Sequence, residues 1–164
     1  MTFRVLTGVV AIAAWAAAGT GAAVAQHPPA PEMPARTVML IVNDPVGDKM
    51  EYSRKQIVAK PGERLRVQLL SMGKLPKVAM AHNWLLLKLG SDPKKFADAA
   101  AGAKDTDFIP RSLKHQIIAE TGLVGPGEKS EVVFTVPKVL GTYPFLCSSP
   151  GHYDAGMKGD LIVK

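Results

Sequence analysis

The sequence has very little cysteine: Cys147 is the only one among 164 residues. A single thiol excludes an intramolecular disulfide, so the chain is not a disulfide-stapled scaffold. It also excludes any metal centre that takes two thiolates from one chain. The lone thiol is therefore the first residue whose role has to be explained.

Aromatic residues and dense basic runs are also scarce. Phe, Trp and Tyr make up 6% of the chain, and its 20 Lys and Arg residues form no continuous stripe. The formal net charge of +6 favours acidic partners or anionic surfaces, but without a basic stripe and interleaved aromatics it does not favour nucleic-acid binding. A hydrophobic content of 47% with 21% charged residues is typical of one globular domain.

The one long apolar run lies at the N-terminus. Arg4 precedes an apolar stretch over 5–18, and small residues lead to Ala23-Val24-Ala25, an A-x-A-like cleavage site. We therefore predict a secretory signal peptide over 1–25, a periplasmic protein without a membrane span, and a charge of +5 after cleavage, because Arg4 is the only charged residue removed. An uncleaved membrane anchor is the alternative, since the run is nearly long enough to cross a bilayer.

A short arm and one domain follow the predicted cleavage site. The segment 26–36 contains Pro28, Pro29, Pro31 and Pro34, which is typical of an extended arm without packed structure. From 37 to 164, short apolar runs alternate with turn residues, and no internal repeat or low-complexity tract occurs. This segment is the predicted folded domain.

The domain is predicted to be all-β. In one run Leu65, Val67 and Leu69 alternate with polar residues, as expected of a half-buried strand. The predicted strands are 37–42, 65–69, 84–88, 131–136, 143–146 and 160–163. One helix is predicted from Pro93 to about Ala101, because proline suits a first helical position. Short strands with one short inserted helix indicate a Greek-key β-sandwich or barrel.

Cysteine, histidine and methionine occur together in one loop near the end of the sequence. Cys147, His152 and Met157 lie between two predicted strands, and glycines such as Gly151 and Gly156 allow the loop to curl until the three side chains converge. Thiolate, imidazole and thioether form a soft ligand set. Two histidines and one cysteine with a weak, distant methionine is the arrangement of blue-copper electron-transfer sites.

The arrangement needs a second histidine. His27 lies in the proline-rich arm, and His115 lies in a polar segment that is a strand or a loop. His82 stands just before Trp84 at the start of an apolar strand, where a sheet can hold it, and it is the histidine we predict. Each residue alone has an ordinary structural explanation, such as a buried thiol or core filler; their joint occurrence favours a metal.

The sequence resembles the azurin and auracyanin group of cupredoxins. The resemblance rests on 75–77 (Leu-Pro-Lys), 80–84 (Met-Ala-His-Asn-Trp) and 147–159, and it extends over about 37–164. It implies an eight-stranded Greek-key β-sandwich with one type 1 copper at one end. It also implies a monomeric one-electron carrier, not an enzyme, between redox proteins such as cytochromes or respiratory and photosynthetic complexes.

The resemblance assigns a role to each matching residue. His82, Cys147 and His152 correspond to the strong in-plane copper ligands and Met157 to the weak axial ligand. Asn83 corresponds to the asparagine that pins the cysteine loop, with Ser148 as its expected partner.

Two features depart from azurins. Four residues separate His152 from Met157, as in auracyanins, where azurins have three, and Ala81 replaces the azurin glycine.

The resemblance also places the exit for the electron at His152. An apolar docking patch with a basic rim is expected around it, formed by Leu75, Pro76, Met80 and Pro150 with Lys74 and Lys77 at the rim.

Three other functions are consistent with parts of this pattern. A copper buffer or chaperone needs an exposed, exchangeable site. A copper nitrite reductase or multicopper oxidase needs a second copper centre, for which few histidines remain. A secreted sandwich with a buried structural thiol needs no metal at all.

The choice of His82 over His115 is directly testable. His82→Gly should open the site and change the copper spectrum, and added imidazole should partly restore it. His115→Ala should leave the spectrum unchanged, as measured by visible absorption of copper-loaded, oxidised protein. The reverse result would mean that the histidine ligand lies on the other segment.

Overall fold

The computed structural model describes residues 34–44 and 50–164. The predicted signal peptide over 1–25 lies outside the described residues, as does most of the predicted arm over 26–36. Arg36, the last residue of that arm, already belongs to the first strand and pairs with Leu65.

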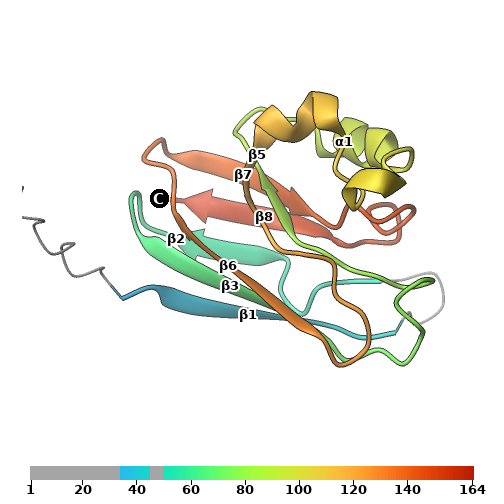
Figure 1. Ribbon diagram of the computed structural model, residues 1–164. Coiled ribbons are helices and arrows are strands. Elements are labelled where there is room, and N and C mark those ends of the chain that lie inside the picture. Colours follow the sequence, from blue (N-terminus) through green and yellow to red (C-terminus); the bar gives the residue numbers. More distant parts are fainter. Residues whose placement is uncertain (1–33, 45–49) are drawn as a thin grey trace, which may run out of the picture. The chain divides into compact units, whose positions relative to one another are not determined.

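Within these described residues, eight strands form two sheets, whose arrangement Figure 1 shows. The three-stranded sheet has the order β1-β3-β6 and contains β1 (Arg36–Val42), β3 (Arg64–Ser71) and β6 (Lys129–Thr135). The five-stranded sheet has the order β2-β8-β7-β4-β5 and contains β2 (Gln56–Ala59), β4 (Leu85–Leu87), β5 (Ile117–Glu120), β7 (Gly141–Leu146) and β8 (Lys158–Val163). The pairs β1–β3 and β2–β8 are parallel, and the others are antiparallel. The predicted eight-stranded sandwich is confirmed.

The main core lies between the two sheets. In β3 every second residue is buried, and Leu65, Val67 and Leu69 have no exposed surface. Burial of each such side chain stabilises the fold by about 1.5–3 kcal/mol. Trp84 and Phe145 meet in the same core with ring centroids 5.8 Å apart. The alternation in the sequence therefore predicted correctly which residues of β3 face the core.

Strand β4 is buried on both sides. Leu86 belongs to the core between the sheets, whereas Leu85 and Leu87 belong to a second cluster that includes Phe96. Phe96 comes from helix α1 (Pro93–Ala100), which lies on the outer side of the five-stranded sheet in Figure 1. Three consecutive leucines are thus explained by a strand with apolar neighbours on both faces.

Helix α1 begins and ends close to the predicted positions. Asp92 precedes it, and its carboxylate accepts hydrogen bonds from the backbone N–H groups of Lys94 and Lys95. Pro93 occupies the first turn, where its missing N–H costs nothing. The prediction of one short inserted α-helix is confirmed.

Four short elements were not predicted. They are strands β2 and β5 and two 3₁₀ helices, Lys104–Thr106 and Arg111–Gln116. Each strand has only four residues, too few for a clear alternation. The second 3₁₀ helix contains His115, which therefore lies neither in a strand nor in a loop.

The pairing of β4 with β5 continues beyond the strands toward His82. The backbone N–H of Thr121 donates to the Trp84 carbonyl at 3.0 Å, and the Trp84 N–H donates to the Thr121 hydroxyl at 2.9 Å. Further along, His82 and Val124 exchange two backbone hydrogen bonds of 2.9 and 2.7 Å. His82 is thus held by a sheet-like ladder, as expected from its place before an apolar strand.

Candidate metal centre

Three predicted ligands converge in the structure. His82, Cys147 and His152 each offer one ligand atom, and these atoms lie within 4.8 Å of one another. The Cys147 sulfur is 3.4 Å from Nδ1 of His152, and the two imidazole centroids are 5.0 Å apart. The three residues are 1%, 0% and 7% exposed. His115 is not part of this group.

Asn83 joins the segment of His82 to the loop of Cys147. Its amide nitrogen donates to the Ser148 hydroxyl at 2.8 Å, and its amide oxygen accepts from the Ser148 N–H at 2.9 Å. The carbonyl of Asn83 accepts a further hydrogen bond, 2.5 Å long, from the buried Tyr52 hydroxyl. The expected pairing of Asn83 with Ser148 is present, whereas nothing in the sequence pointed to Tyr52.

A third side chain makes the same connection. The Ser149 hydroxyl donates to the Ala81 carbonyl at 2.6 Å, and Ser149 is 5% exposed. Together with the Asn83–Ser148 pair, this bond fastens the residues on both sides of His82 to the residues that follow Cys147. The sequence gives no local signal for the bond, because its partners become neighbours only in the folded chain.

The loop from Cys147 to Met157 closes on itself through backbone hydrogen bonds. The Met157 carbonyl accepts from the Cys147 N–H at 3.0 Å, and the Met157 N–H donates to the His152 carbonyl at 2.9 Å. Gly151 and Gly156 have φ angles of +80° and +114°, which favour glycine. The Met157 side chain has no exposed surface and lies in the same core cluster as Cys147.

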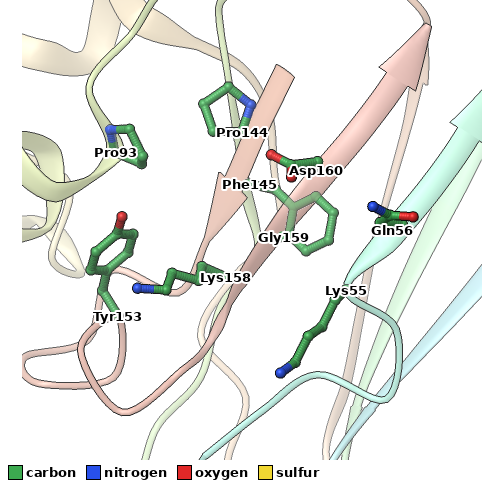
Figure 2. A pocket seen from close by; sticks show the side chains of 9 residues that line it. All are labelled: Lys55, Gln56, Pro93, Pro144, Phe145, Tyr153, Lys158, Gly159 and Asp160. Atoms are coloured by element: carbon green, nitrogen blue, oxygen red, sulfur yellow. The ribbon is translucent and has the colours of Figure 1, made fainter. Parts of the chain in front are cut away.

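The outer side of this loop packs against the second cluster. Tyr153, which follows His152, contacts that cluster. Figure 2 shows the Lys158 side chain reaching toward the Tyr153 ring, whose centroid lies 4.2 Å from the Lys158 ammonium nitrogen. The cavity drawn there, of about 330 Å³, is lined by neither His82, Cys147, His152 nor Met157. It therefore lies outside the metal centre.

A second cavity opens beside His152. It has a volume of about 340 Å³, and its walls include Val78, Pro150 and Phe108 together with His152 itself. Val78 is 92% exposed. The imidazole of His152 is thus the predicted ligand closest to solvent, and its opening is lined by apolar side chains together with Lys77 and Lys104.

Burial controls the protonation of the site. It lowers the pKa of both His82 and His152 to about 4; the Asp44 carboxylate opposes the shift at His82, and the proximity of His82 reinforces the shift at His152. Burial also raises the pKa of the Cys147 thiol, against hydrogen bonds from Asn83 and Ser149 that lower it. Without metal the site therefore holds neutral groups at neutral pH.

The donor set fits a copper ion. Nδ1 of His82 is buried and has no hydrogen-bond partner among the described residues, although an unpaired buried polar atom is costly. A soft thiolate with two imidazoles suits copper in both oxidation states, and binding would displace the thiol proton. A metal ion would give the His82 nitrogen the partner that it lacks.

Comparisons with known proteins support this chemistry. The family model described as copper binding proteins, plastocyanin/azurin family, matches residues 40–164. Azurin from Pseudomonas fluorescens biotype A is 38% identical over 120 residues, which cover 71% of this chain and 92% of that protein. Azurin from Pseudomonas aeruginosa is 37% identical over 120 residues, covering 71% of this chain and 80% of that protein.

Solved structures agree with the sequence comparisons. Reduced auracyanin from Roseiflexus castenholzii superposes with a TM-score of 0.67 at 30% identity, covering 80% of this chain and 99% of that one. Auracyanin A from Chloroflexus aurantiacus, described as a blue copper protein, gives a TM-score of 0.64 at 26% identity, covering 79% and 100%. The chain therefore belongs to the plastocyanin/azurin family of copper-binding proteins as an azurin- and auracyanin-type cupredoxin, and its cofactor is copper.

The lowered pKa values of His82 and His152 predict a pH dependence of the metal-free protein. Between about pH 6.5 and 4 the unfolded chain binds protons at these histidines that the folded chain does not, so the free energy of unfolding should fall as pH falls. The loss should be at most on the order of 3 kcal/mol for each histidine. Urea denaturation at pH 7 and pH 5 measures it.

His82→Gln and His152→Gln should each reduce this pH dependence. A pH dependence that is the same in wild type and both variants would contradict the assigned cause.

Proposed function

We propose that this protein is a one-electron carrier with a single type 1 copper. His82, Cys147 and His152 would bind the ion strongly, and Met157 would be its weak fourth ligand. The convergence of the first three side chains in a buried site carries the proposal. When bound, the copper supplies a Cu(I)/Cu(II) couple that accepts and releases one electron without a proton.

The protein's contribution is to keep the ligands fixed while the charge changes. His82 is held by the ladder to Val124, and the Cys147 loop is held by Asn83 through Ser148. Because these connections lie in a packed interior, the side chains have little freedom to follow a change of oxidation state. Little movement means a small reorganisation barrier, which suits fast electron transfer.

A carrier fits these observations better than the other functions. A copper chaperone needs a site that exchanges its metal, whereas the Cys147 side chain has no exposed surface. A copper oxidase or reductase needs a second centre, and the described parts of the chain contain one group of three or more potential ligands of the His, Cys, Asp and Glu types. We therefore propose that the protein is not an enzyme.

The proposed setting is the periplasm, where a monomer exchanges electrons with redox proteins such as cytochromes or respiratory and photosynthetic complexes. The signal-like sequence over 1–25 supports export. Within the described residues, no helix has the length and apolar character needed to cross a membrane.

The electron is proposed to pass through His152, the ligand beside the open cavity. Leu75 is 43% exposed, and Pro76 and Pro150 are also exposed, which supports the expected apolar docking patch. At its rim, the Lys77 ammonium lies 2.6 Å from a Glu128 carboxylate oxygen. That ion pair partly neutralises the positive rim.

The colour of the oxidised protein tests the proposed function. Copper-loaded protein should be intensely blue or green, because a short thiolate-to-copper bond gives a strong charge-transfer band, and a reductant should bleach it. Cys147→Ser should keep the fold, as judged by circular dichroism, and lose the colour. A colourless wild type with one copper per chain by metal analysis would disprove the proposal.

Replacement of Met157 tests the axial ligand. Met157→Gln introduces a harder oxygen donor that favours Cu(II), so the reduction potential should fall. Met157→Leu removes the donor, so the potential should rise. Redox titration of the copper band measures both, and two variants with the wild-type potential would show that Met157 is not a ligand.

Salt and charge variants test the docking surface. Transfer to an acidic redox partner should slow as salt rises, because screening acts over about 8 Å at physiological ionic strength. At low salt Lys77→Glu should slow it, and Glu128→Gln, which frees Lys77, should accelerate it. Met80→Lys should slow transfer even at high salt, because it damages the apolar contact itself and not the attraction between charges. Stopped-flow rates that change neither with salt nor in any of the three variants would exclude this surface as the docking site.

A further inference from the structure

Ser149 completes the fixation of the peptide that leads into His82. That peptide consists of the Ala81 carbonyl and the His82 N–H. The N–H donates to the Val124 carbonyl at 2.9 Å, and the carbonyl accepts from the Ser149 hydroxyl at 2.6 Å. Both polar ends of the peptide are therefore satisfied, one by the sheet and one by the loop that carries Cys147 and His152.

Ala81 lies beside the metal centre: it directly precedes His82, and it lines one cavity together with Ser149 and His152. A carbonyl oxygen carries partial negative charge, which stabilises a neighbouring centre more when that centre is more positive. The Ser149 O–H dipole offsets this charge. The hydroxyl should therefore disfavour the oxidised state of the centre relative to the reduced state.

We propose that Ser149 is a positioning residue of the copper centre and that its hydroxyl raises the reduction potential by compensating the Ala81 carbonyl. The inference rests on the proposed function, because it requires a copper ion that cycles between two oxidation states. It adds a residue that acts through its neighbours and not by binding the metal.

The test compares three variants by redox titration of the copper band. Ser149→Ala should shift the equilibrium about tenfold toward the oxidised form, which lowers the potential by about 59 mV for one electron. Ser149→Thr keeps the hydroxyl and should retain most of the wild-type value. Ser53→Ala is the matched control, because the Ser53 hydroxyl also binds a backbone group, the Ile41 N–H at 2.9 Å, outside the metal centre.

The free energy of unfolding of each metal-free variant distinguishes a residue that tunes the reduction potential from one that only stabilises the fold. A merely structural serine would lower the free energy of unfolding in Ser149→Ala without moving the potential, and that result would overturn the inference. An unchanged or higher potential in a coloured Ser149→Ala protein would also overturn it. If Ser149→Ala does not fold, Ser149→Gly gives the same comparison. A colourless wild type would instead disprove the proposed function itself.

Discussion

Two hydrogen bonds between Asn83 and Ser148 connect parts of the chain that are 65 residues apart in sequence. The metal centre depends on them, because His82 comes from one of these parts and Cys147 from the other. Both bonds are buried, where water does not compete and where an unpaired amide would cost about 1–3 kcal/mol. The surrounding sandwich keeps the metal centre rigid, and the Asn83–Ser148 pair fixes how the segment of His82 is aligned with the loop of Cys147.

The same burial that protects these bonds prepares the site for a metal. Removal of water disfavours protonated His82 and His152, and it disfavours the Cys147 thiolate as long as no cation is present. A bound copper ion would stabilise the Cys147 thiolate by its positive charge and would bind the nitrogen atoms of the neutral histidines. Apolar packing and metal affinity are therefore two results of one arrangement.

Local sequence patterns predicted much of this arrangement. The part that they did not predict consists mainly of contacts between residues that are distant in sequence. The spacing of Cys147, His152 and Met157 and the position of His82 before an apolar strand were enough to nominate the site, and the structure brings His82, Cys147 and His152 together. The hydrogen bonds of Tyr52 and Ser149 were not foreseen, because their partners lie 31 and 68 residues away. Strands β2 and β5 were missed because four residues show too little periodicity.

The parallel pairing of β2 with β8 has a consequence for how the protein folds. Among the described residues, β2 pairs with β8 alone, yet all other strands of both sheets except β1 lie between the two in sequence. Pairings of such high contact order form slowly, since a long loop must close before any contact rewards it. The loop of Cys147 lies directly before β8, so the buried arrangement of His82, Cys147 and His152 is complete only after the last strand has paired.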